Sequence, residues 1–469
     1  MKLIKGLSTL SAAILLTACG GDDNNDSKAA VYAANSKLVA GESSVSYTGQ
    51  VARQVLISEL KKLIGSDELQ NVANKAEALE KLNAIYEKGT TDTTGNLVST
   101  DVYSGGLTAT TVGISLKTEN AELVQATYAD ISGDKNLLGK TAGVDNALTY
   151  AEFIGWNVAE VAVPGKDAAT GERSKPYALI QQWFDEIADL AVDGDADTRY
   201  VTADGRDLQQ LVQKFLSGAV TYSQAAEDYL NKNKGLRKQN SEADKEGKPY
   251  TSLEHQWDEG FGYFGAARDY NRYTDAENKA QQDHDSNGDG DIDLTSEYSF
   301  GHSVNAVKRD VGATVVTDFS RGAMDAFIEG RRIINANVGT NPEAGEGYHA
   351  EISEQAEIAL NNWEKAVAAT VVHYINDSVA DLNNYGGTDF NVDDLAKHWS
   401  EMKGFALGLQ FRPFALITEA QLVEIHDLMG EAPEFADQAE VDAYIVKLGE
   451  ARDIMQSAYG FDAENVANW

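Results

Sequence analysis

Apolar residues recur every three or four positions along most of this chain, and that spacing places them on one side of an α-helix. The clearest stripes predict helices over residues 49–64, 67–87, 176–190, 208–232 and 351–384. Six prolines occur among 469 residues, and proline is the residue that a helix interior tolerates least. We therefore expect an all-α fold.

The remaining stripes are shorter, and two stretches interrupt them. Further helices are expected over residues 149–162, 252–267, 315–336, 394–411, 418–430 and 438–458. Residues 89–148 are rich in Thr, Gly, Ser and Asp and predict a long irregular insertion, whereas residues 233–249 predict a charged linker. This order predicts two consecutive helical bundles, over residues 46–275 and 301–469, joined by residues 276–300.

A short pattern occurs once in each expected bundle. In both copies a Trp is followed by a Glu two positions later and by a Gly five positions later: Trp257, Glu259 and Gly262 in the first, Trp399, Glu401 and Gly404 in the second. A recurrence at fixed offsets predicts that one structural unit is used twice, in pseudo-symmetric halves. The two glycines are expected where helices approach closely.

Each copy also carries a histidine close to its glutamate. His255 and Glu259 are four positions apart, and His398 and Glu401 are three apart, so each pair lies on one helix face. If the two helices faced each other, these four side chains could hold a transition metal, iron or zinc. The alternative is that Trp and Gly pack the core while each His-Glu pair makes a polar contact at its edge.

The stretch between the expected bundles matches the opening of an EF-hand calcium loop. Ligand oxygens are expected from alternate positions: Asp285, Asn287, Asp289, the carbonyl of Asp291, and Asp293. Gly290 stands where the loop turns sharply, and Ile292 is the apolar residue two positions later. Ser296 replaces the usual glutamate and Glu297 follows one position late, so calcium binding should be weak. The alternative is an acidic linker.

The N-terminus has the form of a lipoprotein export signal. Lys2 and Lys5 precede an apolar run, and residues 16–19 end in Cys19, the single cysteine of the chain. We expect residues 1–18 to be removed, Cys19 to carry the lipid, and residues 19–45 to form a flexible tether. The absence of Asp after Cys19 predicts the outer membrane.

Charge and composition exclude several classes of protein. Without Lys2 and Lys5 the chain has 37 basic and 74 acidic residues, a net charge of −37 that disfavours nucleic acid as a partner. Attachment to a membrane must then come from the lipid anchor. One cysteine allows no disulfide framework and no thiolate metal site, and the chain has no His-Glu-x-x-His, Gly-x-Ser-x-Gly or phosphate-loop motif.

Several motifs resemble known families. Residues 255–265, 398–411, 458–461 and 465–469 resemble a bacterial lipoprotein family, domain-of-unknown-function family 4856, from which no activity carries over. A more distant resemblance is to the imelysin group, helical-bundle proteins linked to iron uptake that carry a Gly-x-His-x-x-Glu motif. Residues 396–401 keep the His and the Glu of that motif, with Ala396 in place of its Gly. This resemblance implies iron at the His-Glu pairs.

Three functions remain open from the sequence. The first is an outer-membrane lipoprotein whose helical body binds a cation, with calcium as a structural ion and iron or a metal complex as the ligand passed to an uptake partner. The second is a hydrolase or peptidase that uses carboxylates and a metal-bound water. The third is a structural or interaction lipoprotein. The first requires His255 and His398 to lie close together, and the second also requires an open cleft.

Overall fold

The computed structural model describes residues 31–87, 116, 118, 121–132, 135–164, 173–193 and 200–469. Helices dominate this part of the chain, so the all-α prediction is confirmed. The α-helices are α2 (Thr48–Ile64), α3 (Asp67–Gln70), α4 (Lys75–Tyr86), α5 (Tyr128–Ile131), α6 (Lys175–Asp193), α7 (Leu208–Leu216), α8 (Ser252–Phe264), α9 (Asp275–Ala280), α10 (Gly301–Gly312), α11 (Phe319–Ala336), α12 (Gly347–Leu382), α13 (Val392–Gly408), α14 (Glu419–Met429), α15 (Gln438–Tyr459) and α16 (Ala463–Asn468).

Strands and other helical turns are short in the described residues. β1 (Glu122–Leu123) pairs in parallel with β4 (Asp291–Ile292), and β2 (Val161–Ala162) pairs antiparallel with β3 (Arg173–Ser174). The 3-10 turns are η1 (Leu138–Lys140), η4 (Gly235–Arg237), η5 (Tyr270–Arg272) and η6 (Leu409–Phe411). Helix α7 runs on into two π-helical segments, η2 (Ser217–Tyr222) and η3 (Gln224–Tyr229). The helix expected over residues 208–232 is therefore present, with a wider helical turn in its second half.

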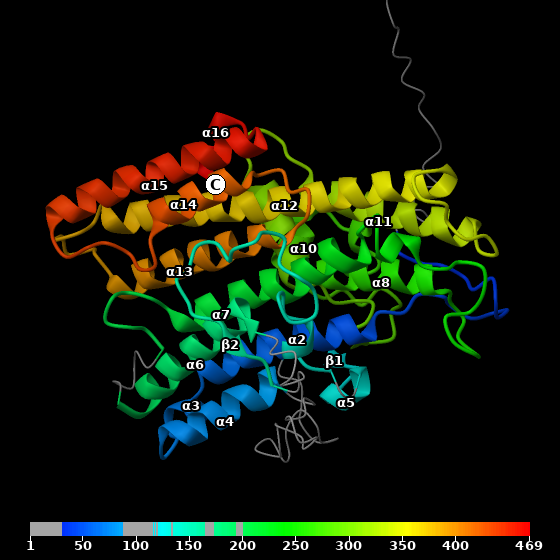
Figure 1. The fold of residues 1–469 in the computed structure, drawn as a ribbon, viewed down its shortest axis with the longest axis horizontal. Helices are drawn as coiled ribbons and strands as arrows, with labels where there is room; N and C mark the ends of the chain where they lie inside the picture. Colours follow the sequence, from blue (N-terminus) through cyan, green and yellow to red (C-terminus); the bar gives the residue numbers. More distant parts are fainter. Residues whose placement is uncertain are drawn as a thin grey trace, which may run out of the picture.

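Helix α12 is the longest element, and its neighbours are arranged along it. Its 36 residues span about 54 Å at 1.5 Å per residue. Helices α10, α11, α13 and α15 all pack against it. Figure 1 shows α14, α15 and α16 along one side of the molecule and α7, α6, α3 and α4 toward the other.

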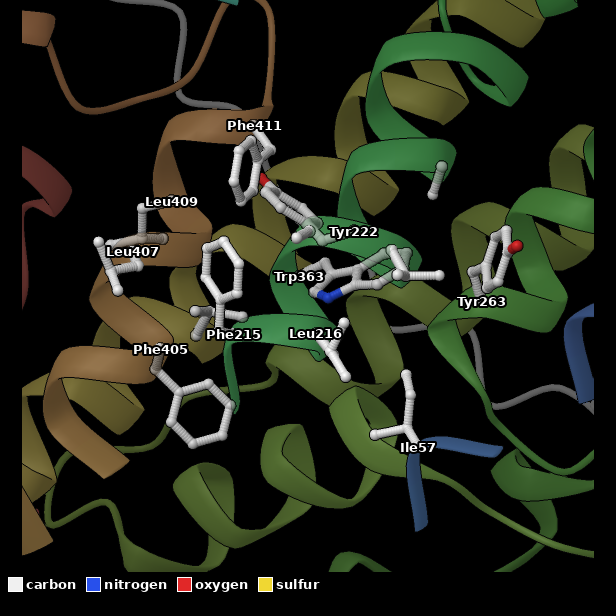
Figure 2. Packing of buried hydrophobic residues seen from close by; sticks show 14 of the residues in the cluster. Ile57, Phe215, Leu216, Tyr222, Tyr263, Trp363, Phe405, Leu407, Leu409 and Phe411 are labelled. Atoms are coloured by element: carbon white, nitrogen blue, oxygen red, sulfur yellow. The ribbon is translucent and has the colours of Figure 1, made fainter. Parts of the chain in front are cut away.

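In the described residues the hydrophobic core is continuous across residues 276–300, the segment that the sequence predicts to join two separate bundles. Helix α7, from the first expected bundle, packs against α13 from the second, and α8 packs against α11. The buried ring of Trp363 lies 5.2 Å from Tyr222 and 5.3 Å from Phe264, measured between centroids. Both partners precede the expected boundary, and Figure 2 shows this mixing of elements around Trp363. Apolar stripes predict which face of a helix is buried but not which helix covers it.

The segment 149–162 is not a helix, although its apolar spacing predicted one. Gly155 has φ +88°, a left-handed conformation that ends any regular helix there, and a Cβ on it would lie 2.5 Å from the ring of His426. The Gln410 side chain binds both the N–H and the carbonyl of Ile154, at 2.8 and 3.0 Å. This extended segment presses Phe153 and Trp156 into the core. Short apolar patterns do not separate these two conformations.

Two other boundaries differ from expectation. Residues 67–87 form two helices, because Asn74 starts α4 by accepting a hydrogen bond from the backbone N–H of Glu77. Helix α10 was not predicted, since the second expected bundle had no helix before residue 315. The described part of the insertion, residues 121–132 and 135–148, contains elements of two to four residues. The first part of the insertion, residues 89–115, lies outside the described residues.

The end of the expected tether is part of the folded body. Tyr32 is fully buried, its ring stacks on Phe261 at 3.8 Å, and its hydroxyl donates to Asp258 at 2.6 Å. Ser44 is also fully buried. Residues 31–45 therefore do not form a free tether, because Tyr32 and Ser44 are buried in the folded body. Residues 1–30, with Cys19, lie outside the described residues.

Candidate functional site

Helix α8 sorts its side chains into an inner and an outer face. Thr251 and Glu254 form a capping box at its start, and Gly265 ends it at φ +83°. Trp257 is fully buried and donates from its indole to the carbonyl of Phe327 at 3.0 Å. His255, Gln256 and Glu259 line a cleft on the outer face.

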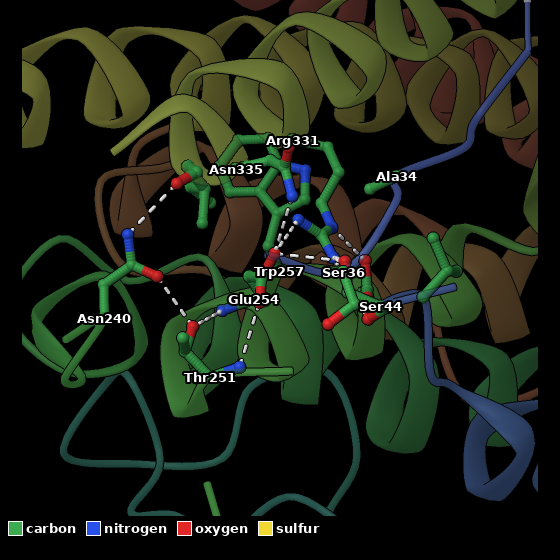
Figure 3. A network of polar contacts seen from close by, with 12 residues as sticks. Ala34, Ser36, Ser44, Asn240, Thr251, Glu254, Trp257, Arg331 and Asn335 are labelled. Carbon is green, nitrogen blue, oxygen red and sulfur yellow. Dashed lines mark hydrogen bonds and ion pairs between the residues drawn. The ribbon is translucent and has the colours of Figure 1, made fainter. Parts of the chain in front are cut away.

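The inner face carries a buried ion network. Arg331 of α11 donates to Glu254 at 2.8 Å and to Asp258 at 2.7 Å, and none of these side chains is more than 1% exposed. Arg331 also donates to the hydroxyl of Ser44 at 2.8 Å, while Asn335 donates to Glu254 at 3.1 Å (Figure 3). Burial favours a neutral guanidine, but the two carboxylates outweigh it and raise the pKa of Arg331 above its ordinary value.

Sequence reasoning missed this network. The available signal was the spacing of Glu254 and Asp258, which are four positions apart and flank the Trp257 side of the helix. Among 74 acidic residues that spacing does not stand out, and the partner Arg331 lies 73 positions beyond Asp258. A second buried pair was missed in the same way. Arg412 donates to Glu364 at 2.6 Å, and the two side chains are 3% and 0% exposed.

The first predicted His-Glu pair makes local contacts. Nδ1 of His255 lies 2.9 Å from the carbonyl oxygen of Ser46, so this nitrogen carries the proton, and Nε2 lies 3.8 Å from Glu259. Glu259 accepts from the amides of Gln50, at 2.8 Å, and Gln256, at 3.1 Å. Both carboxylate oxygens therefore have amide donors already.

The second pair is in a different place and has different partners. Nδ1 of His398 lies 2.8 Å from a carboxylate oxygen of Asp381, on α12, and this contact raises the pKa of His398. Glu401 forms an ion pair with Lys214, on α7, at 3.1 Å. Among the described residues, these four side chains do not form a group of ligand atoms within 4.8 Å of one another. The geometry therefore does not support the prediction that His255, Glu259, His398 and Glu401 share a metal. Each pair instead has its own separate partners, which are uncharged groups for His255 and Glu259 and charged side chains for His398 and Glu401.

The glycines of the repeated pattern do permit close helix contact, as predicted. A Cβ on Gly262 would lie 2.8 Å from Tyr47 at the start of α2, and one on Gly404 would lie 2.7 Å from Cβ of Lys214 on α7. Trp399 is fully buried like Trp257, but its indole donates to the hydroxyl of Tyr444 at 2.6 Å. The pseudo-symmetry of the two halves stays a prediction.

The calcium-loop residues form a closed turn. Gly290 has φ +94°, as the sharp turn requires, and the Asp285 carboxylate accepts backbone N–H groups of Gly288 at 2.7 Å and Gly290 at 2.9 Å. Asn287 accepts from the N–H of Asp289, and Asp289 from that of Asp291, at 2.8 and 3.0 Å. Both contacts tighten the same turn. The loop is thus shaped by its own side chains.

The far end of the loop is tied to the protein body. Ile292 is buried, and its carbonyl accepts from Val124 N–H at 2.9 Å beside the β1–β4 pair. Glu297 is 2% exposed and accepts from the N–H groups of Ser286, at 2.9 Å, and Asp293, at 3.0 Å. Although burial favours a protonated Asp293, hydrogen bonds from Thr295 and Gln125 hold its pKa below the ordinary value.

One tight carboxylate group occurs elsewhere in the part of the chain that the structure describes. Asp275, Asp310 and Asp318 bring ligand oxygens within 4.8 Å of one another. Asp310 is already used at the start of α11, where it accepts from the N–H groups of Phe319 and Ser320 at 2.9 and 2.8 Å. This cluster has a structural role in beginning that helix.

The cleft on the outer face of α8 is the largest site near these motifs. It encloses about 460 Å³ and is lined by residues of α2, of the 132–140 stretch, of η3, of the 238–250 loop and of α8. Its basic residues are Arg53, Lys135, Lys140, Lys238 and Lys248, and its acidic residues are Asp228 and Glu259. Sequence reasoning identified two of its members, His255 and Glu259, but not the cleft.

These features define an all-helical protein with a polar surface cleft and a closed acidic loop. Residues 185–416 match the family described as a domain of unknown function, DUF4856, and this part of the chain belongs to that family. The C-terminal motif over residues 458–469 lies beyond the match, and the resemblance to the imelysin group rests on sequence motifs alone. No curated protein and no solved structure matches the chain.

Proposed function

We propose that this protein is a lipid-anchored binding module of the cell envelope that holds calcium in the loop over residues 285–297. The observation that carries the calcium site is the closed turn, in which Gly290 has φ +94° and Ile292 is buried. Asp285, Asn287, Asp289, Asp293 and the carbonyl of Asp291 supply hard oxygen ligands at the spacing that calcium loops use.

Glu297 is the residue that completes the proposed site in place of Ser296. Its carboxylate accepts hydrogen bonds from the N–H groups of Ser286 and Asn287, at 2.9 and 3.2 Å. These contacts use one oxygen, Oε1, whereas Oε2 accepts a single hydrogen bond, from the N–H of Asp293 at 3.0 Å. A carboxylate oxygen that accepts one hydrogen bond keeps a further lone pair for a cation, so Oε2 is the oxygen that would bind calcium. Because Glu297 stands one position late, we expect affinity of about 10⁻⁴ to 10⁻³ M, the range of extracellular calcium modules.

The experiment is a calcium titration of the mature protein, followed by calorimetry and by the melting temperature. The variant Asp285→Asn, Asp289→Asn keeps oxygen acceptors for the turn but removes two negative charges. It should lose the calcium heat and the calcium-dependent rise in melting temperature. The charge-matched control is Glu242→Gln, Glu246→Gln, at two exposed positions outside the loop, and it should bind like the parent. Equal heats from all three proteins would refute the calcium site.

The membrane part of the proposal rests on the N-terminal sequence. Cys19 would carry the lipid and direct the protein to the outer membrane, where an uptake protein would receive its ligand. Among the described residues no helix is both long and apolar enough to cross a bilayer.

Ligand binding is favoured over a purely structural role by the cleft beside α8. Its volume of about 460 Å³ falls within the range of roughly 300 to 1,000 Å³ that is common for small-molecule sites. A hydrolase that uses a metal between the two His-Glu pairs is not supported, because His398 binds Asp381 and Glu401 binds Lys214. We therefore place the binding function in the cleft.

A further inference from the structure

The residues that line the cleft beside α8 are mostly basic, whereas the protein as a whole is acidic. The whole chain has 74 acidic and 39 basic residues, so a random lining would carry about two acids for each base. The cleft is lined instead by five bases, Arg53, Lys135, Lys140, Lys238 and Lys248, and by two acids, Asp228 and Glu259. A concentration of positive charge in a hollow attracts anions.

The positive charge comes from separate parts of the chain. Arg53 belongs to α2, Lys135 precedes η1 and Lys140 is its last residue, and Lys238 and Lys248 belong to the loop before α8. No single basic run of the sequence could line the cleft from these sides. The fold therefore gathers these cations.

Within the part of the chain that the structure describes, most of these cations have no carboxylate partner. Lys140 forms an ion pair with Asp145 at 2.7 Å. Among the described residues, no Asp or Glu oxygen lies within 4.0 Å of a side-chain nitrogen of the other four, Arg53, Lys135, Lys238 or Lys248. Arg53 donates to the carbonyl oxygens of Asn136, at 2.9 Å, and of Gly49, at 3.2 Å. The acid Glu259 is occupied by the amides of Gln50 and Gln256.

The start of helix α2 adds a second source of positive potential. Thr48, Gly49 and Gln50 line the cleft, and they form the first turn of this 17-residue helix. The N-cap residue, Tyr47, provides no side-chain acceptor, and the first turn contains no acidic residue. An uncapped helix N-terminus attracts negative charge through its free N–H groups and its dipole.

We propose that this cleft binds a small polyanion, a molecule with two or more carboxylate or phosphate groups. The volume of about 460 Å³ suits a small molecule rather than a polymer. Attraction within the cleft acts over short distances, because charges more than about 8 Å apart are screened at physiological salt. The surrounding acidic surface therefore repels long polyanions without preventing a small one from entering. This assignment rests on the proposed role as a binding module and names its class of ligand.

The test is calorimetric titration of the mature protein, freed of calcium on a chelating resin, with citrate, pyrophosphate and inorganic phosphate. Triethyl citrate, which carries no charge, serves as the control for citrate. We expect citrate or pyrophosphate to bind more tightly than inorganic phosphate and triethyl citrate to give no heat. Binding of citrate alone would identify a polycarboxylate ligand, and binding of pyrophosphate alone would identify a ligand with phosphate groups. No heat from any of the anions would overturn the proposal.

Two matched variants separate the cleft from general charge effects. Lys135→Gln, Lys248→Gln removes two cations that line the cleft, and we expect it to weaken anion binding about tenfold, with a weaker dependence on salt. Lys62→Gln, Lys245→Gln removes two exposed cations outside the cleft and should bind like the parent. Equal losses in both variants would overturn the assignment to this cleft. A parent that binds calcium but no anion would leave the calcium loop standing while this inference fails.

Discussion

Arg331 donates from Nη1 to Oε1 of Glu254 across 2.8 Å, and the two side chains are 1% and 0% exposed. With Asp258 on the same guanidinium, this contact joins α11 to α8. A buried pair of this kind costs more to break than it contributes, because the remaining charge is left without a partner.

Replacing Arg331 should therefore destabilise the protein strongly. We expect Arg331→Met to lower the free energy of unfolding by about 3–5 kcal/mol, because two buried carboxylates lose their cation. The neighbouring Arg332 pairs with Glu329, and these side chains are 65% and 41% exposed. Arg332→Met should change stability by less than about 1 kcal/mol. Urea unfolding of both variants measures the difference.

A rescue separates lost charge balance from lost packing. Adding Glu254→Gln and Asp258→Asn to Arg331→Met removes the two unpaired charges and should restore part of the stability. If the triple variant is no more stable than Arg331→Met, the cost arises from packing rather than from charge.

The contact between η2 and α13 leaves no room for a side chain on Gly218. A Cβ on Gly218 would lie 2.4 Å from the Cα of Gly408, and backbone cannot move aside as a flexible side chain does. We expect Gly218→Ala to destabilise the protein by roughly 1–3 kcal/mol. Gly449, inside α15, has nothing within 4 Å of its added Cβ, so Gly449→Ala should stabilise by about 0.5–1 kcal/mol. Opposite shifts in the urea midpoint are the expected result, and equal shifts would contradict the close contact.

Lys403 should make the free energy of unfolding depend on pH in the alkaline range. It is fully buried, and burial lowers its pKa to about 7, with His426 beside it and Glu431 and Asp427 as the nearest opposing charges. Between pH 7 and about 10.5 the unfolded chain holds a proton on this lysine that the folded chain lacks, so its contribution to stability rises with pH. Lys403→Met removes that dependence.

The measurement compares the parent with Lys403→Met in urea at pH 7 and at pH 9.5. The variant should be the more stable protein at pH 7, and its advantage should shrink by roughly 3 kcal/mol at pH 9.5, at about 1.4 kcal/mol for each pH unit. An advantage that does not change with pH would mean that Lys403 stays charged in the folded protein.

Cys19 should decide where the protein resides. The variant Cys19→Ser cannot receive a thioether-linked lipid, so we expect it in the soluble fraction rather than with membranes. Cell fractionation followed by immunoblotting measures this. A variant that remains in the membrane fraction would show that another part of the chain holds it there.

Local structure was predicted from the sequence more accurately than long-range contacts. The spacing of apolar residues gave α2, α6 and α12 close to their observed limits, because a helix needs only the backbone of neighbouring residues and one buried stripe. The turn around Gly290 follows from a conformation with positive φ that glycine adopts without strain. The error over residues 149–162 arose where the Gln410 side chain, 256 positions away, holds Ile154 in an extended form.

The sequence by itself determined the helical class, the turn of the acidic loop and the membership of residues 185–416 in a known family. Only the tertiary structure decided that Arg331 meets Glu254, that His255 and His398 have separate partners, and that cations from three segments line one cleft. Backbone sterics and turn chemistry act between neighbours along the chain, so a sequence reveals them directly. The pairing of distant charges depends on which helix faces pack together, and that is settled by the burial of the whole core.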